Sequence, residues 1–497
     1  MRGFLAGSFF SFLKGALVLA INSDVDLTTK KIHLMGIGGA GMSGLAILLD
    51  QIGARVSGCD IFQTTYLESL KKKKIAIEMG HEAGHIDEFQ PDILVYSSAI
   101  PHDHPEILRA KEMGITVAQR AEVLSIIFNS RRGVGIAGTH GKTTTSSMIS
   151  LIAEMAGISP TVAIGGELSD IGTNAKLGTG KYMVAELDES DRSFVYFHPE
   201  IAIVTNIDWD HRDHYPTFKT VTDAFADFLG NRKDPGLGII CMEDGGVNTL
   251  CRDYALRDDI QTYGWGTGWN WGATEVEHNI GGGISYMLNH DGEKIDRVTL
   301  AVSGEHNVLN SLAACAASHA MKIPFDSVKR SLSVFHGAKR RLQKMGEVDG
   351  ILIYDDYGHH PNEIRATLNT VRKIFPNRRL VAIFQPHRFS RTAALYKEFA
   401  EVLSFTDKSF ILPVYGSDEK PIEGVSSKLI LDAAPDNDKH RYELSGNFDE
   451  LITSVCSMVR NGDVILTIGA GSVGTLGRKI CDRLQKKHLS DGAAKSC

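Results

Sequence analysis

The sequence predicts three successive α/β domains, and three observations carry this prediction. The chain has 497 residues, which corresponds to roughly three domains of about 150 residues each. It contains 50 glycines but only 14 prolines, a balance that suits many tight turns between strands and helices. From Lys31 onward, apolar segments that end in glycine or small polar residues alternate with helical segments. This is the pattern of repeated βαβ units, so mostly parallel sheets with right-handed crossovers are expected.

Composition and charge exclude several classes of protein. With 43% hydrophobic and 23% charged residues, the chain is neither disordered, collagen-like nor a polytopic membrane protein. A net charge of −7 argues against a broad nucleic-acid-binding surface but leaves a local phosphate site open. The seven cysteines are odd in number and contain no CxxC pair, which argues against a disulfide framework or a zinc site and for a reducing compartment.

The first set of elements opens on a glycine-rich turn. Residues 31–60 read as strand, turn, helix and strand, and the turn at 36–41 is GIGGAG, which matches GxGxxG. Asp60 ends the second strand about twenty residues later, which completes the fingerprint of a Rossmann-like nucleotide site. On the motif alone, NAD and other nucleotides such as a UDP-sugar fit equally well. The turn residues expected at the ligand are Gly36, Gly38, Gly39, Gly41 and Met42.

The second set opens on GIAGTHGKTTT at 135–145, which is the strongest single signal. Glycines let backbone N–H groups face a phosphate, and the following helix N-terminus adds a positive dipole end. Lys142 would supply a charge to the β- and γ-phosphates, and Thr143 a hydroxyl for Mg²⁺. The strict pattern GxxxxGK[ST] fails by one residue, because position 136 is Ile. The predicted ATP-binding loop comprises Gly138, Thr139, His140, Gly141, Lys142, Thr143 and Thr144.

Two later clusters place polar side chains at strand ends. AELDESD contains Glu186 and Asp188, and TNIDWDHRDH contains Asn206, Asp208, Asp210 and His211. Taken alone, such clusters are usually solvated loops. The ligand side of a phosphate-loop sheet lies at its strand ends, so together with the loop they favour Mg²⁺ binding.

Eight motifs in order resemble a known family. They are GIGGAGMSG, GTHGKTTT, ELDESD, VTNIDWDH, SGEHNVLNSLAA, KRR, DDYGHHP and FQPHRFSRT, and they resemble the ATP-dependent Mur ligases of peptidoglycan synthesis over about residues 31 to 475. The resemblance implies a Rossmann-like UDP-sugar domain at 31–131, a central phosphate-loop ATPase-like domain with a mixed sheet at 132–338, and a Rossmann-like amino-acid domain at 339–497. Residues 1–30 would form an extension.

The resemblance also implies a reaction and its ligands. L-alanine would be joined to the carboxylate of UDP-N-acetylmuramate through an acyl phosphate, with ATP converted to ADP and phosphate. ATP and Mg²⁺ would be required, with Mn²⁺ a possible substitute. The expected enzyme is a cytoplasmic monomer or homodimer without nucleic-acid partners or stable membrane association.

Site residues follow from the matched motifs. The metal would be held by Thr143, Glu186 and His211. Further ATP contacts would come from His306, Asn307, Asn310, Arg340, Arg341 and Asp356. The amino acid would meet Tyr357, His359, Arg388 and Arg391, and the sugar nucleotide Ser98, Ala99, Ile100 and Arg120 as well as the glycine turn. Catalysis would rest on Lys142, Glu186, His211, His359, Arg388 and Arg391. Arg388 and Arg391 lie three residues apart, so helical spacing predicts a shared face for the alanine carboxylate and the transferring phosphoryl group.

Alternatives remain open at this point. The polar residues at 306–310 could merely cap a helix, KRR could be a solvated basic turn, and His140 could be a spacer. A ligase that attaches recovered tripeptides, an NAD-dependent dehydrogenase and an inactive binding protein are the competing functions. The apolar segment at 4–21 resembles a signal peptide, but Lys14 interrupts it. Since the implied ligands are cytosolic, a misassigned start or a short amphipathic lead is favoured.

Overall fold

The computed structural model describes residue 21 and residues 24–97, 100–166, 172–212, 214–256, 258–279, 283–337, 340–417 and 419–494. The chain divides into two compact units, Met1–Arg131 and Arg132–Cys497. Two expectations fall outside the described residues: nearly all of the signal-like segment, and the sugar-nucleotide contacts Ser98 and Ala99.

The first unit is built on a five-stranded parallel sheet. Its strand order is β3-β2-β1-β4-β5, which is a Rossmann-like order. The strands are β1 (Lys31–Met35), β2 (Arg55–Asp60), β3 (Ala76–Met79), β4 (Ile93–Tyr96) and β5 (Thr116–Gln119). The helices are α1 (Ala40–Ile52), α2 (Thr65–Lys72), α3 (Gly84–Phe89), α4 (Pro105–Glu112) and α5 (Arg120–Asn129), after a 3₁₀ turn at Leu27–Thr29. The predicted strand, glycine turn and helix therefore form as expected.

A ten-stranded mixed sheet follows in the second unit, in the order β15-β14-β13-β12-β11-β10-β6-β9-β7-β8. Its strands are β6 (Arg132–Ala137), β7 (Thr161–Ala163), β8 (Ala175–Lys176), β9 (Tyr182–Glu186), β10 (Ile201–Val204), β11 (Leu237–Cys241), β12 (Ile260–Trp265), β13 (Trp271–His278), β14 (Ile284–His290) and β15 (Glu293–Leu300). Strands β13, β14 and β15 pair antiparallel.

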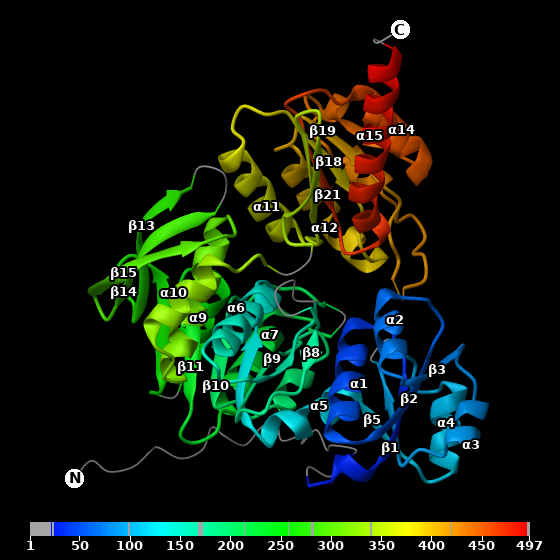
Figure 1. Ribbon diagram of the computed structural model, residues 1–497, viewed down its shortest axis with the longest axis vertical. Coiled ribbons are helices and arrows are strands. Elements are labelled where there is room, and N and C mark those ends of the chain that lie inside the picture. The colour runs from blue at the N-terminus through cyan, green and yellow to red at the C-terminus, as the bar shows by residue number, and fades with distance from the viewer. Residues whose placement is uncertain are drawn as a thin grey trace. The chain divides into compact units, whose positions relative to one another are not determined.

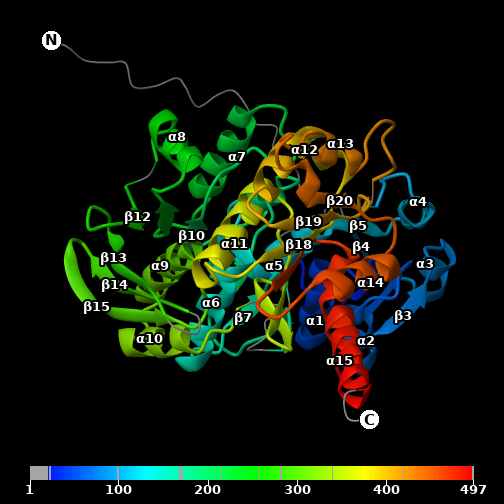
Figure 2. The same cartoon turned by 90° about the horizontal axis from the view of Figure 1, so that it is seen from above.

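Helices of the middle sheet pack on its apolar faces. They are α6 (Lys142–Met155), α7 (Phe218–Gly230), α8 (Gly245–Asp253), α9 (Glu305–Ala320) and α10 (Phe325–Ser333), with a 3₁₀ turn at Ser193–Tyr196. Figures 1 and 2 show α6 and α9 side by side. Ile149 and Ile152 of α6 share one buried core with Leu312 and Ala316 of α9 and with the strands. This core fixes the start of α6, where the phosphate loop lies.

The same unit contains a third sheet, in the order β16-β17-β21-β18-β19-β20. Its strands are β16 (Gln343–Val348), β17 (Ile351–Asp356), β18 (Leu380–Phe384), β19 (Lys408–Ile411), β20 (Tyr442–Leu444) and β21 (Val464–Ile468). The helices are α11 (Pro361–Ile374), α12 (Phe389–Leu403), α13 (Lys428–Asp432), α14 (Phe448–Met458) and α15 (Leu476–Ala494), with 3₁₀ turns at Lys439–Arg441 and Ser472–Thr475. All pairs are parallel except β16 with β17. Two buried clusters cover its two faces, so the predicted three-domain α/β architecture is confirmed.

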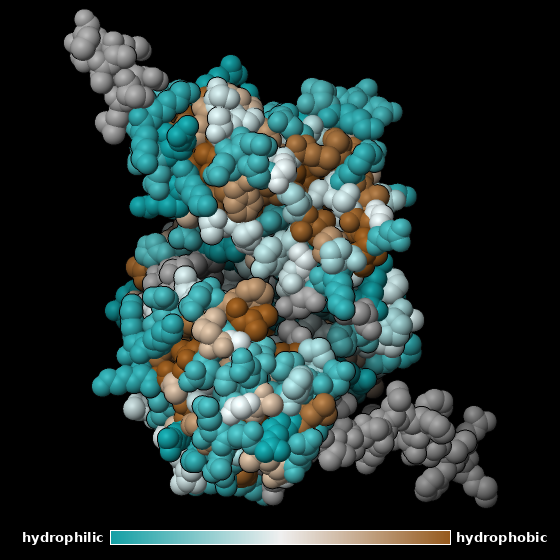
Figure 3. Space-filling view, turned by 90° about the vertical axis from the view of Figure 1, so that its right-hand side faces the viewer, coloured by the Kyte–Doolittle hydropathy of each residue, from teal (hydrophilic) through white to brown (hydrophobic). Residues whose placement is uncertain are grey.

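Within the described part of the chain, none of the helices combines the length and apolar character needed to cross a membrane. The face shown in Figure 3 is largely hydrophilic, with hydrophobic side chains in small groups.

Candidate active site

The phosphate loop connects the end of β6 to the start of α6. Gly138 and Gly141 have φ of 135° and 84°, which an L side chain rarely adopts. A Cβ on Gly141 would lie 2.6 Å from the Asn310 side-chain oxygen. The segment after the neighbouring strand β10 holds the loop in place. The Asn206 side-chain amide accepts a hydrogen bond from the His140 N–H and donates one to the His140 carbonyl, each at 2.8 Å. The loop is therefore held by residues that follow it by more than 60 positions.

Lys142 is the first residue of α6 and lies in a carboxylate environment. Its Nζ donates to the Gly138 carbonyl at 2.5 Å and lies 2.8 Å from a Glu189 oxygen. Burial lowers the pKa of Lys142, but Glu189, Asp188 and Glu186 outweigh it, so the pKa is raised. The ammonium group is thus charged and is held at the mouth of the loop.

Thr143 and Glu186 face each other across the sheet edge. The Thr143 hydroxyl donates to Glu186 Oε2 at 2.9 Å, and the Gly165 N–H donates to the same oxygen at 2.9 Å. These are hard oxygen ligands of the kind Mg²⁺ prefers. The donor chemistry therefore fits a magnesium ion shared by Thr143 and Glu186.

His211 lies beside another carboxylate of the acidic strand end. Its Nε2 lies 3.7 Å from Asp210 Oδ2, and its backbone has φ of 50°. Asp210 in turn lies 3.1 Å from Nη2 of Arg391, which comes from α12 of the third sheet. His211 therefore belongs to an Asp210–Arg391 group.

The two arginines of FQPHRFSRT have different partners. Arg391 lies inside α12, whereas Arg388 precedes its first helical residue, with φ of 71° and ψ of 136°. Arg388 Nε lies 2.8 Å from Glu419 Oε1. The expectation that helical spacing puts both guanidinium groups on one face is therefore wrong, since Arg388 does not have helical backbone geometry.

His140 connects the loop to α11. Its ring nitrogens lie 3.6 Å from Asp208 Oδ2 and 3.3 Å from Glu363 Oε1. Burial lowers the pKa of His140, but the two carboxylates outweigh it and raise the pKa to about 9. His140 in turn lowers the pKa of Asp208 to about 2. The Asn362 amide also donates to Asp208 at 2.5 Å. The phosphate loop, the acidic strand end and α11 therefore form one charged network.

A cavity of about 1220 Å³ lies beside this network. Of the predicted ATP contacts, those that line it are His140, Gly141, Thr144, His306, Asn307, Asn310, Arg341 and Asp356. Burial and the nearby Arg341 lower the pKa of His306 to about 4, so its ring is neutral at physiological pH. The cavity therefore combines neutral hydrogen-bonding groups such as His306 with charged groups such as Arg341 and Asp356.

The two arginines of the KRR motif have different contacts. Arg341 lines the cavity and lies 3.6 Å from Glu363, whereas Arg340 donates through Nε to Asp355 at 2.8 Å and through Nη2 to the Gly469 carbonyl at 2.5 Å. Asp356 accepts from the Leu342 and Gly358 N–H groups at 2.8 Å each.

Tyr357 and His359 lie close together beyond the cavity. Their ring centroids are 5.5 Å apart, and the Arg340 guanidinium lies 5.0 Å from the Tyr357 ring. Burial lowers the pKa of His359 to about 3. This ring is therefore neutral at physiological pH.

The N-terminal turn is organised by Asp60. One Asp60 oxygen accepts from the Gly38 N–H at 2.8 Å and the other from the Phe62 N–H at 2.9 Å. A Cβ on Gly41 would lie 3.2 Å from the Arg120 side chain, so the guanidinium lies against the start of α1. Met42 is buried, and Ile100 Cδ1 lies 3.6 Å from the Cβ position of Gly36. Gly39 is the N-cap of α1, with φ of −72°.

Sequence reasoning did not assign Glu189, Asn362 and Glu363 to the site. Glu189 lies within ELDESD, where the pattern drew attention to the two preceding acidic residues. Glu363 completes a capping box with His360 at the start of α11. A proline at the first helical position with glutamate at the third is a recognisable helix start, but nothing local shows that it faces His140.

Taken together, the fold and the site define an ATP-dependent ligase, in which a phosphate loop and two acidic strand ends meet an arginine on α12, a helix of the third sheet. The chain belongs to the Mur ligase family. Residues 31–132 match the Mur ligase family catalytic domain, 136–318 the Mur ligase middle domain, and 340–471 the Mur ligase glutamate ligase domain.

Relatives along nearly the whole chain agree with this. A protein of Desulforamulus reducens named UDP-N-acetylmuramate–L-alanine ligase is 41% identical over 92% of this chain and 98% of its own length. One of the same name from Geotalea daltonii is 38% identical over 92% and 98%. The crystal structure of the UDP-N-acetylmuramate–alanine ligase MurC of Thermotoga maritima superposes with a TM-score of 0.78, at 29% identity over 92% of this chain and 100% of that one.

Proposed function

We propose that this chain joins L-alanine to the carboxylate of UDP-N-acetylmuramate and converts ATP to ADP and phosphate. Two relatives of about 40% identity, each named UDP-N-acetylmuramate–L-alanine ligase, align with this chain over 98% of their own length. The observation that carries the proposal is the charged Lys142 at the loop, beside the oxygen pair of Thr143 and Glu186. This arrangement suits transfer of a phosphoryl group.

The chemistry needs positive charge because both reactants are anionic. The sugar carboxylate attacks the γ-phosphate, its oxygen–phosphorus bond forms, and ADP leaves. Lys142 would stabilise charge on the transferring group, and Arg391, held by Asp210, would lie on the opposite side of the site. Mg²⁺ held by Thr143 and Glu186, with His211 nearby, would neutralise phosphate charge when bound.

The second step forms the amide. The neutral amine of alanine attacks the acyl carbon, phosphate leaves with the C–O electron pair, and the amine proton passes to solvent. Arg388 would hold the alanine carboxylate. His359 would contribute a neutral ring to the pocket, since its pKa is about 3 and an imidazolium there would repel the incoming ammonium group.

The domain roles follow from this assignment. Residues 31–131 would bind the UDP-sugar, 132–338 ATP and Mg²⁺, and 339–497 the amino acid. The Asp60 turn and Arg120 would then contact the pyrophosphate and sugar of the first ligand.

Phosphate release with ATP, Mg²⁺ and UDP-N-acetylmuramate tests the proposal, across L-alanine, glycine, L-serine and L-Ala-γ-D-Glu-diaminopimelate. We expect release that requires the sugar nucleotide and is fastest with alanine. One methyl group is worth about 10–200-fold, so glycine should be slow and serine partly accepted. Release with the tripeptide alone would assign the chain to tripeptide attachment instead. No release with any acceptor would overturn the proposed activity.

A further inference from the structure

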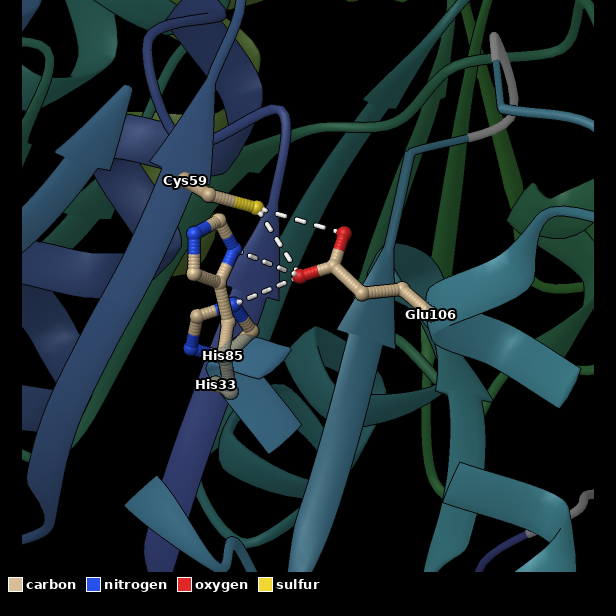
Figure 4. Close-up of side chains that lie close together, drawn as sticks. All are labelled: His33, Cys59, His85 and Glu106. Carbon is tan, nitrogen blue, oxygen red and sulfur yellow. Dashed lines mark hydrogen bonds and ion pairs between the residues drawn. The ribbon is translucent and has the colours of Figure 1, made fainter. Parts of the chain in front are cut away.

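The first unit contains a buried cluster of soft and borderline metal ligands outside the predicted nucleotide turn. It consists of His33 in β1, Cys59 in β2, His85 in α3 and Glu106 in α4, whose ligand atoms all lie within 4.8 Å of one another. Figure 4 shows the thiol and both rings pointing toward the Glu106 carboxylate. The four residues come from four different elements, so the cluster exists only in the folded unit.

The three distances to the carboxylate are close to the edges of a coordination tetrahedron. Glu106 Oε1 lies 3.0 Å from His85 Nδ1, 3.4 Å from His33 Nε2 and 3.4 Å from Cys59 Sγ. Metal–ligand bonds of about 2.0–2.3 Å place neighbouring ligands of a tetrahedral zinc site roughly 3.3–3.8 Å apart. The remaining three pairs of ligand atoms lie within 4.8 Å of one another, so binding a metal ion would draw them together by up to about 1 Å.

His33 provides an independent indication of a ligand. Its side chain is 1% exposed, and its Nε2, 3.4 Å from Glu106 Oε1, makes no well-formed hydrogen bond to the described residues. Its other nitrogen, Nδ1, lies 2.8 Å from the Ser57 hydroxyl. Metal-bound histidines usually hydrogen-bond through the second nitrogen, which fixes the tautomer and aims the free nitrogen at the metal. Ser57 supplies that contact here.

Charge balance selects the class of metal. Glu106 is completely buried, and a carboxylate with no net compensating charge is costly in that position. One thiolate and one carboxylate neutralise a divalent cation. Two imidazoles, a thiolate and a carboxylate suit Zn²⁺, whereas Mg²⁺ and Ca²⁺ prefer oxygen ligands alone.

We propose that His33, Cys59, His85 and Glu106 bind a zinc ion in the N-terminal unit. On binding, the Cys59 S–H bond breaks, a sulfur–zinc bond forms, and the proton leaves. His81 lies at the more exposed side of the cluster, with Nδ1 3.0 Å from Cys59 Sγ, and is placed to receive this proton before it passes to solvent. No oxidant or reductant is involved.

The site would tie α3 and α4 to the two central strands. Without metal, burial and Glu106 raise the pKa of the Cys59 thiol, which then donates to that carboxylate. With metal, the same groups become a cross-link. Asp60 directly follows Cys59 in β2, so the cross-link would also fix the residue that organises the nucleotide turn.

Cobalt titration of the purified full-length chain tests the proposal. Tetrahedral Co²⁺ has visible bands, and a thiolate ligand adds a near-ultraviolet charge-transfer band. We expect one equivalent of Co²⁺ to produce both and Zn²⁺ to displace them. Cys59→Ser and His85→Ala should abolish the charge-transfer band or weaken Co²⁺ binding at least about tenfold, and Ser57→Ala should weaken it about 10–100-fold. Cys481→Ser, another buried cysteine, is the matched control and should behave as wild type.

A parallel measurement keeps the test decisive if a variant folds poorly. Zn²⁺ should raise the melting temperature of wild type and of Cys481→Ser but not of His85→Ala, and circular dichroism would establish that each variant is folded. A wild-type chain without the charge-transfer band, or one whose band survives Cys59→Ser, would overturn the proposal and leave a hydrogen-bonded polar cluster. The test does not depend on ligase activity, so it is independent of the proposed function.

Discussion

Two of the glycine-rich turns each join a parallel strand to a helix, the turn after β1 and the loop after β6, and their surroundings differ sharply. The turn after β1 contains no charged side chain, and its Gly38 N–H is taken by Asp60. The loop after β6 carries His140 and Lys142, which face Asp208, Glu363 and Glu189.

Under the proposed function, one local motif would serve two kinds of ligand. The turn after β1 would bind through backbone N–H groups, Asp60 and the neighbouring Arg120, which suits a nucleotide that is held but not cleaved. A loop surrounded by charged side chains provides an electric field that can stabilise the charge that develops during phosphoryl transfer. Adjacent strands, rather than the glycines, decide which of these a turn becomes.

Removing the loop charge should have the largest effect. Lys142→Ala is expected to lower phosphate release by at least about 10³-fold, because it removes the ammonium charge held at the mouth of the loop. Calorimetry should show UDP-N-acetylmuramate binding within about twofold of wild type, since Lys142 and the turn after β1 belong to different compact units. Loss of that binding would contradict the independence of the two turns.

The reverse experiment weakens the N-terminal turn. Asp60→Ala removes the acceptor of the Gly38 and Phe62 N–H groups. We expect UDP-N-acetylmuramate affinity to fall about 10–100-fold, from the cost of unpaired backbone donors. ADP affinity, measured on the same sample, should not change. The exposed Asp50→Ala on α1 is the control, and equal losses in both variants would refute a special role for Asp60.

Matched alanine substitutions compare the two helix starts. Gly141 has φ of 84° and Gly39 has φ of −72°, and each is the N-cap of its helix. Gly141→Ala should lower the free energy of unfolding by about 1–3 kcal/mol, from left-handed strain and the nearby Asn310 side chain. Gly39→Ala should change it by less than about 0.5 kcal/mol. Urea unfolding measures both, and a larger loss for Gly39→Ala would contradict the assigned geometries.

Titration of His140 gives the smallest effect and is specific to the loop. Its folded pKa is about 9 against an ordinary 6.5, so its contribution to stability is complete below pH 6.5 and is lost as pH rises through 9. The melting-temperature difference between wild type and His140→Gln should shrink over that window, by an amount equivalent to about 1–2 kcal/mol. A difference that grows with pH would contradict this prediction.

Much of the fold was predictable because the relevant signals are local. The alternation of strand and helix segments predicted mostly parallel sheets. The motif GIGGAG with Asp60 and the loop with Lys142 marked the first strand-to-helix turns of the first two sheets. Glu363 was not predictable, because its only local signature is a capping box on α11. The predicted shared face for Arg388 and Arg391 was wrong for a related reason. Residue spacing predicts a common face only where the backbone is helical, and Arg388 precedes the helix.

Cysteine spacing illustrates the limit most clearly. With no CxxC pair, the sequence argues against a zinc site, since spacing reports only ligands that lie on one turn or hairpin. The fold nevertheless gathers Cys59, His33, His85 and Glu106 from two strands and two helices.

By itself, the sequence determined the element types, the three-domain α/β architecture, the glycine turns and the residue types that phosphate chemistry needs. Those properties depend on periodicity, turn chemistry and short motifs, which operate over a few residues. Only the tertiary structure decided which charges face His140 and Lys142, which arginine lines the cavity, and which four side chains surround Glu106. Those outcomes depend on the pairing of strands far apart in the chain and on the packing of helices over them, and no local pattern encodes the resulting distances.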